Sequence, residues 1–361
     1  MKVPVQRIGP LACLPHVLAP HHVPLSSVIA GLPVSEEDFR PETLLPIPVI
    51  SAILERASRL TGDTEIGLRI GEGQNHLSLG PLGQLMASCE TLGSALGTFA
   101  GFQMANSTAA AAWLHPVGEE YAFGFGVYIP DLASSHVYDV SAAVGFNLVR
   151  DLTQGAVTPV EVLLSRPAPA DPAAYRQFFR CPVRFDEGQT CLILPRRGLS
   201  TRLASADPLQ HEHLVQAMRQ KLAETHPDFA SRVRHALRPL LIAGAASHLQ
   251  VAAHLNMHPR TFGRRLEAEN VTFETLKDDV RKAVSQELLA RTGLAIADVG
   301  AALGYGTPSA FVRAFRRWTG KSPSAWRQNL HVHLPAVSKW QTLAAEASVS
   351  SIEHGTEGAS S

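Results

Sequence analysis

The segment IADVGAALGYGTPSAFVRAFRRWTGKSPSAWR, residues 296–327, predicts two helices joined by a tight turn. The second helix is expected to begin at Thr307 and Pro308. Threonine caps helix N-termini, and proline suits the first helical position, where its missing N–H would have no partner anyway. Phe311 and Phe315 lie four residues apart, on one face of this helix. That spacing indicates that they dock the second helix on an apolar core.

A similar unit precedes this one by 48 residues. The heptapeptide VAAHLNM at 251–257 is echoed by VGAALGY at 299–305, and HPRTF at 258–262 corresponds to TPSAF at 307–311. In both units the residue after the leading valine is small, which allows a second helix to cross closely. A helix, a turn of three to four residues and another helix form the DNA-binding arrangement whose second helix enters the major groove.

The sequence between the two units predicts one long amphipathic helix over 273–291, FETLKDDVRKAVSQELLAR. Its apolar residues recur on a single face. Nineteen residues at about 1.5 Å each give roughly 28 Å. A spacer of that length could hold two recognition helices about one DNA turn, roughly 34 Å, apart.

The net charge of zero hides a division along the chain. Residues 231–330 carry 15 Lys and Arg against 7 Asp and Glu, a net charge of +8. Residues 1–230 carry −6, and the remainder of the chain carries −2. Such asymmetry suggests that the basic part meets a polyanion, although basic faces are often only solvated.

The basic segment resembles the AraC/XylS family of transcription regulators. Residues 296–327 follow the family signature almost throughout, with the LGY turn at 303–305 and the closing GKSP at 320–323, followed by Trp326 and Arg327. The resemblance implies a bacterial regulator in which the second helix of each unit reads bases. We expect Trp326 to belong to the core, as we do for Trp318.

The resemblance also implies individual roles in helices that begin at Pro259 and Pro308. By position, the base-reading residues are Arg260, Thr261 and Arg264 in the first helix and Ser309, Ala310 and Arg313 in the second. Arginine can make two parallel hydrogen bonds to guanine, worth about 1–3 kcal/mol of discrimination, so the three arginines are the leading readers. A phosphate contact or a solvated position is the alternative for each. Arg316, Arg317, Lys321 and Arg327 are predicted to hold phosphates.

Three positions depart from the family pattern. Asn256 stands where glycine is usual in the first turn, although asparagine also tolerates a left-handed conformation. Gly263 replaces a commonly polar, base-facing residue and weakens its helix by about 1 kcal/mol. Ser285 replaces a common alanine in the long helix. The first unit is therefore expected to read fewer bases than the second.

The region before the basic segment predicts a mixed α+β domain. The patterning indicates helices over 47–60, 91–105, 137–152 and from Asp171 to Phe179, a hairpin of 110–114 with 121–129, and strands at 160–164, 183–185 and 191–194. The stretches 80–83, 91–96 and 168–194 resemble the arabinose-binding-like sensor domain fused to one branch of the AraC family. That label does not identify the effector as arabinose.

Within this region we find no signature of a catalytic site. His211 and His213 are two residues apart, a spacing that favours surface positions over a metal site. The cysteines at 13, 89, 181 and 191 are expected to be reduced and buried. Pairing of Cys181 with Cys191 on neighbouring strands is the alternative. Seven side chains could line an apolar cavity, but ordinary core is the favoured interpretation of each, and we assign no effector-binding residue: Phe99, Phe102, Met104, Trp113, Tyr121, Phe123 and Phe125.

These observations predict a sensing and dimerisation domain over 1–225, a DNA-binding domain over 229–330 and a disordered tail over 331–361. The predicted function is effector-responsive, sequence-specific regulation of transcription. Double-stranded DNA and a small-molecule effector are the expected partners, with RNA polymerase and a second copy of the chain also considered. We expect no cofactor, metal or membrane partner and a cytoplasmic location, since no apolar run approaches a membrane span and no export signal is visible.

Two alternatives remain open on the sequence alone. One is an enzyme with an appended DNA-binding module, such as the alkyl-transferring repair regulators, although the metal-bound reactive cysteine cluster that they need is lacking. The other is a ligand-independent DNA-binding protein whose first domain only oligomerises. Whether the protein activates or represses is not visible in the sequence.

Overall fold

A five-stranded sheet forms the centre of the N-terminal domain. The computed structural model describes residues 4–129, 134–224 and 228–329. The strand order is β3 (Ala110–Val117), β4 (Glu120–Val127), β7 (Thr190–Pro195), β5 (Glu161–Leu163) and β6 (Val183–Arg184), antiparallel except for the β5–β6 pair. A separate two-stranded sheet joins β1 (Val5–Arg7) to β2 (Leu44–Pro46). The predicted hairpin is confirmed as β3 and β4, with Gly118 at φ +58° in its turn.

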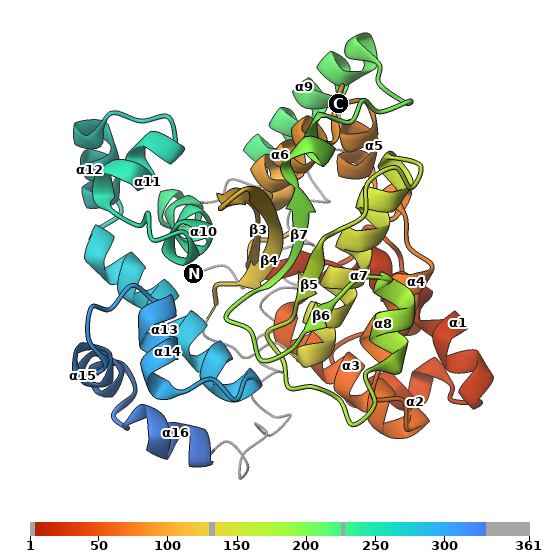
Figure 1. Ribbon diagram of the computed structural model, residues 1–361, viewed down its shortest axis with the longest axis horizontal. Coiled ribbons are helices and arrows are strands. Elements are labelled where there is room, and N and C mark those ends of the chain that lie inside the picture. Colours follow the sequence, from red (N-terminus) through yellow and green to blue (C-terminus); the bar gives the residue numbers. More distant parts are fainter. Residues whose placement is uncertain (1–3, 130–133, 225–227, 330–361) are drawn as a thin grey trace, which may run out of the picture.

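Helices surround this sheet, as Figure 1 shows. They are α1 (Leu14–Leu18), α2 (Leu25–Ile29), α3 (Ile47–Thr61), α4 (Ile66–Glu72), α5 (Pro81–Ala87), α6 (Leu92–Phe102), α7 (Ser135–Leu152), α8 (Ala173–Phe179) and α9 (Pro208–Glu224). Shorter 3₁₀ turns are η1 (Gly9–Cys13), η2 (Ala19–His21), η3 (Glu36–Asp38), η4 (His76–Leu79), η5 (Gln103–Ala105) and η6 (Arg196–Ser200). The long helix α7 packs on α3 and α4 and against β4 and β7, so it lies between the helices and the sheet.

The predicted helices of the N-terminal domain are confirmed within a few residues. Thr91 caps α6, where its Oγ1 accepts a hydrogen bond from the backbone N–H of Ser94. The prediction of one helix as far as residue 105 was too long, because α6 ends at Phe102 and a 3₁₀ turn follows. Asp171 accepts a hydrogen bond from Ala173 N at the start of α8, but the N-cap is Pro172, so the predicted cap lies one residue too early.

The cysteine prediction is only partly confirmed. Cys89 and Cys191 are buried, whereas Cys13 and Cys181 are half-buried, and all four are free thiols. The alternative, in which Cys181 and Cys191 lie on neighbouring strands, was wrong. Cys181 precedes β6 and Cys191 lies in β7, and β5 runs between these two strands.

The C-terminal domain is helical. It contains α10 (Phe229–Ile242), α11 (His248–His254), α12 (Pro259–Ala268), α13 (Phe273–Arg291), α14 (Ile296–Ala302), α15 (Pro308–Thr319) and α16 (Pro323–Asn329). The bounds of α13 are those predicted for the linker helix. The predicted domain junction and the predicted tail, residues 331–361, fall largely or wholly outside the described residues.

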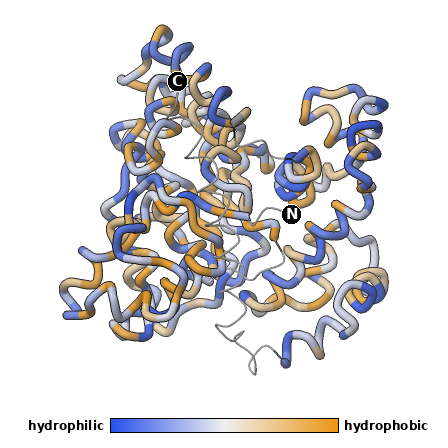
Figure 2. Tube along the Cα trace, turned by 180° about the vertical axis from the view of Figure 1, so that it is seen from behind, coloured by the Kyte–Doolittle hydropathy of each residue, from blue (hydrophilic) through white to orange (hydrophobic). Residues whose placement is uncertain are grey.

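The two domains share one apolar core. Its buried side chains come from α3, from both strands of the hairpin and from α10 to α15. Helix α10 packs against β3, and the ring of Tyr128 meets that of His235 on α10 at 5.7 Å. Figure 2 shows apolar residues running through both domains and hydrophilic residues among the outer helices. Most of the contact between the domains is therefore apolar.

Candidate nucleic-acid interface and sensor cavity

Helices α11 and α12 form one helix-turn-helix unit, and α14 and α15 form the other. The turns match at the residue level, because Asn256 has φ +53° and Gly304, at the corresponding position, has φ +74°. Asparagine thus adopts the left-handed conformation that the sequence requires of it. Thr307 caps α15 as predicted, accepting a hydrogen bond from Ala310 N at 3.3 Å. His258 caps α12 through Nδ1, which accepts from Arg260 N.

Buried aromatic side chains dock both second helices. Phe262 of α12 and Phe311 and Phe315 of α15 have no exposed surface. A Cβ atom placed on Gly300 would lie 3.0 Å from that of Phe311. The small residue after the leading valine therefore permits the close helix crossing that the repeat predicts. Trp326 lies 5.9 Å from the ring of Phe315, but it and Trp318 are half-buried and pack against the core, so the prediction of core positions is only partly confirmed.

The predicted base readers lie on the outer faces of α12 and α15. Arg260, Arg264, Ser309 and Arg313 are exposed, while Thr261 and Ala310 are half-buried. Among the described residues, none of the three arginines forms an ion pair in the free protein. Figure 1 shows α12 and α15 on the side of the C-terminal domain that faces away from the sheet. The outer surface of both recognition helices is therefore open to a partner.

The four predicted phosphate contacts differ in their surroundings. Arg316 and Lys321 are exposed. Arg317 donates to Asp278 of α13 at 2.6 Å, but its side chain remains 67% exposed. Arg327 is half-buried and donates to the backbone oxygens of Leu289 at 3.1 Å and Leu294 at 2.7 Å. Its guanidinium holds α16 against the end of α13, so donors that were predicted to hold a phosphate are engaged within the chain.

Two positioning residues were missed from the sequence. Arg281 of α13 donates a hydrogen bond to Leu303 O at 3.3 Å, and its guanidinium lies 4.7 Å from the centre of the Tyr305 ring. The linker helix therefore contacts the turn of the second unit directly. Glu269 accepts from the backbone N–H groups of Phe229 and Ala230 and thereby ties the end of α12 to the start of α10. A glutamate just beyond a recognition helix could have suggested a contact with a backbone N–H group. Its partner could not be identified from the sequence, because Phe229 lies 40 residues earlier.

A cavity lies in the N-terminal domain among β1, α3, α6, α7 and the sheet. Its volume is about 120 Å³, and its walls are mainly apolar. One water needs roughly 10–15 Å³ on this scale, so the cavity can hold a small molecule. Of the seven side chains considered from sequence, Phe99, Phe123 and Phe125 line it. The other four, Phe102, Met104, Trp113 and Tyr121, are not among its lining residues.

An ion pair lies buried where the domains meet. Arg238 of α10 has no exposed surface, and its Nη2 donates to both carboxylate oxygens of Glu287 of α13 at 3.1 Å. Its Nε donates to the backbone oxygen of Val127 in β4 at 3.1 Å, and its guanidinium lies 5.6 Å from the ring of Trp113. A Cβ on Gly126 would come within 2.5 Å of this guanidinium. Glycine in β4 therefore makes room for the arginine.

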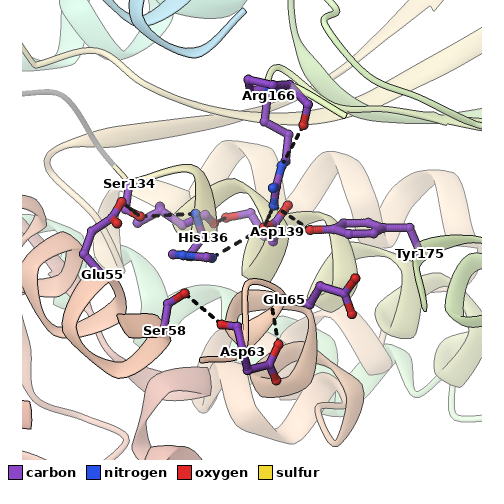
Figure 3. A network of polar contacts seen from close by, with 12 residues as sticks. Glu55, Ser58, Asp63, Glu65, Ser134, His136, Asp139, Arg166 and Tyr175 are labelled. Carbon is purple, nitrogen blue, oxygen red and sulfur yellow. Dashed lines mark hydrogen bonds and ion pairs between the residues drawn. The ribbon is translucent and has the colours of Figure 1, made fainter. Parts of the chain in front are cut away.

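A second polar network stabilises the N-terminal domain itself (Figure 3). Asp139 of α7 is completely buried and accepts hydrogen bonds from Arg166 and from the hydroxyl of Tyr175 in α8. Burial, followed by the charge of Asp139, raises the pKa of Tyr175, which keeps the hydroxyl protonated as a donor. His136 lies next to Asp139, with its Nδ1 3.8 Å from the carboxylate. The network holds α7, α8 and the segment after β5 together.

One half-buried histidine at the domain interface, His235, is expected to make the stability of the protein depend on pH. Burial, and then the charge of His254, lowers the pKa of His235 from 6.5 to about 4. The unfolded chain takes up a proton first, so this contribution is complete above about pH 6.5 and is lost as the pH falls toward 4. The expected loss is about 3 kcal/mol.

Chemical unfolding at several pH values tests this expectation. His235→Phe, which keeps a ring against Tyr128, should show a flatter fall in the free energy of unfolding between pH 6.5 and 4. His213→Phe, at an exposed position, should follow the wild type. If His235→Phe kept the full pH dependence, another group would have to be responsible.

Two helix-turn-helix units with open basic faces, fused to an α+β domain, define a DNA-binding regulator. Residues 24–203 match the family model described as the arabinose-binding domain of AraC transcription regulators, and residues 251–329 match a helix-turn-helix domain. The HTH-type transcriptional regulator VirS of Mycobacterium tuberculosis is 28% identical over 279 residues, 76% of this chain and 82% of that protein. The ornithine utilization regulator of Pseudomonas aeruginosa is 27% identical over 277 residues, 75% and 81% of the two chains.

A solved structure, that of the transcriptional regulator CdpR from Pseudomonas aeruginosa, covers 73% of this chain and 86% of that one, with 26% identity and a TM-score of 0.38. The chain belongs to the AraC/XylS family of transcription regulators and carries its arabinose-binding-like N-terminal domain. It is a sequence-specific DNA-binding regulator rather than an enzyme.

Two other kinds of feature are absent from the part of the chain that the structure describes. No helix there is long and apolar enough to cross a membrane. Within the same ranges, no group of three or more histidine, cysteine or acidic side chains could hold a metal ion. His211, considered above for a metal, instead has its Nδ1 3.1 Å from the hydroxyl oxygen of Ser88.

Proposed function

We propose that α12 and α15 enter successive major-groove segments of one DNA duplex, with α13 as the spacer between them. The observation that carries this proposal is the pair of matched units with open basic faces on a 19-residue helix. Arg260, Arg264 and Arg313 would read guanine edges, and Thr261, Ser309 and Ala310 would contact neighbouring base pairs. Arg316, Arg317 and Lys321 would hold phosphates, whereas the backbone contacts of Arg327 argue for a supporting role.

In this proposal the chain divides into a sensing and dimerisation domain, residues 1–225, and a DNA-binding domain, residues 229–330. The N-terminal domain responds to a small-molecule effector bound in its cavity. Interactions with RNA polymerase and with a second copy of the chain belong to the same proposal.

The coupling between cavity and DNA-binding domain would run through the centre of the interface. Phe125 lines the cavity and meets the ring of Tyr138 at 6.4 Å. Burial, followed by the charge of Glu287, raises the pKa of Tyr138, and the same carboxylate is bound by Arg238. A ligand that moves Phe125 would therefore shift the balance between two poses of α10 and α13, provided that it binds them with different affinities.

Gel retardation with the purified full chain tests DNA binding by the proposed surface. The protein should retard upstream DNA of a neighbouring operon, and its affinity should fall steeply as salt rises, because phosphate contacts release counterions. A variant with Arg316 and Lys321 both changed to alanine should depend less steeply on salt, with the slope reduced by about two. Arg59→Ala, on the exposed end of α3, is the matched control. Binding that is absent or insensitive to salt would contradict the proposal.

A further inference from the structure

Two neighbouring segments place polar side chains on the wall of the cavity, although most of this wall is apolar. These side chains are Gln6 and Arg7 of β1 and Gln103 and Asn106 after α6. Backbone hydrogen bonds link β1 to the turn after α6, from Arg7 N to Asn106 O at 2.7 Å and from Asn106 N to Gln103 O at 2.9 Å. The remainder of the wall is built mainly from aliphatic and aromatic side chains, among them Ile50, Leu54, Phe99, Phe123, Phe125 and Leu148.

Arg7 is the one charged residue among the described residues that line the cavity. It is 8% exposed, and its Nη1 donates to Ser78 O at 2.9 Å. The charge of Glu42 reaches it, but Arg7 forms no ion pair with any residue that the structure describes. A cation largely removed from water and without an ion-pair partner is costly, so an anion bound beside Arg7 would be stabilised by it.

Two hydrogen-bond acceptors near Arg7 also lack partners. The side-chain oxygens of Gln6 and Gln103 are buried and accept no hydrogen bond within the described ranges. Gln103 is 3% exposed, and it lines the cavity. A buried acceptor without a donor costs free energy, and a ligand O–H or N–H would satisfy it.

We infer that the cavity binds a small monocarboxylic acid, with its carboxylate at Arg7, a hydroxyl at Gln6 or Gln103 and an apolar chain or ring along the phenylalanines. This inference rests on the proposed function and names the class of its effector. A free sugar suits the cavity poorly, because the apolar wall offers few partners for its several hydroxyls. A phosphate dianion would leave a second charge uncompensated beside a single guanidinium. The volume corresponds to roughly ten non-hydrogen atoms.

Calorimetry on the full chain with four probes tests this inference: octanoate, octanamide, 2-hydroxyoctanoate and L-arabinose. Octanoate and octanamide have nearly the same shape and differ in charge. We expect octanoate to bind about 10- to 100-fold more tightly, as befits a charge-assisted hydrogen bond. The hydroxy acid should bind more tightly still, and arabinose should be the weakest. These comparisons need no variant of the protein.

Arg7→Gln should remove the preference for octanoate over octanamide, and Arg7→Lys should keep part of it. Arg59→Gln repeats the first substitution on the exposed surface of α3 and should behave like the wild type. Equal affinity for acid and amide, no binding of either, or an unchanged preference in a folded Arg7→Gln variant would overturn the inference. Gel retardation with the same preparation separates the outcomes, because loss of DNA binding would contradict the proposed function, whereas loss of acid binding alone would contradict the effector class.

Discussion

Replacing Arg238 with alanine is expected to lower the free energy of unfolding of the full chain by about 3–5 kcal/mol. The substitution leaves the carboxylate of Glu287 buried without its counter-charge. It also leaves the backbone oxygen of Val127 without its donor and opens a space beside Trp113. Each of these changes falls on the surface between the two domains, so the loss should be accompanied by weaker coupling between cavity and DNA.

Urea unfolding followed by circular dichroism measures this loss. Arg234→Ala is the matched control, since Arg234 also lies on α10 and pairs with Asp279, but partly in solvent. Its expected cost is at most about 1 kcal/mol. Changing Arg238 and Glu287 together to leucine should recover most of the stability, because no buried charge then remains. If Arg238→Ala cost no more than Arg234→Ala, the buried pair would not hold the domains together.

Replacing Arg313 with alanine is expected to relax the preference of the protein at one or two base pairs, by about 1–3 kcal/mol for each guanine that the side chain reads. The side chain is exposed on α15 and lacks an ion pair, so nothing in the described part of the chain competes for its guanidinium. The variant should therefore lose affinity for the preferred DNA sequence, and it should lose little affinity for sequences that already lack the guanine.

Lys321→Ala is the comparison that distinguishes recognition of bases from contact with phosphates. Lys321 is exposed beyond the end of α15, and its replacement should weaken binding to all sequences about equally. Gel retardation against a set of duplexes, each with one base pair changed, measures both variants at a fixed salt concentration. If the two variants showed the same pattern of weakened affinity, the division between base-reading and phosphate-holding residues would be wrong.

The sequence predicted the C-terminal domain in more detail than the N-terminal one. Helix α13 has the predicted bounds, and Thr307 caps α15 as expected, because caps, periodicity and the repeat all act over a few residues. Helices such as α4 and α9 were missed. The sequence IGLRIGE of α4 is short and contains two glycines, and it is stabilised by packing on α7 rather than by its own propensity.

The cavity and the buried ion pair could not be predicted from local pattern. Arg7 and Gln103 line the same cavity although nearly a hundred residues separate them in the sequence, and the pattern around Arg238 is typical of a surface residue in an amphipathic helix. One signal was present, however. The alternation FGFGV in β4 places Gly124 and Gly126 in the interior of a strand, which often marks the close approach of another group. Trp113 and Arg238 are those groups.

The shared apolar core limits how this protein could have been assembled from interchangeable parts. A helix-turn-helix pair joined to its partner by a flexible linker can be transferred to a new sensor without other changes. Here α10 lies against β3 and buries Arg238 over Gly126. A recombination between relatives that separated the hairpin from α10 would leave an arginine facing a side chain, so these two segments are expected to be inherited together.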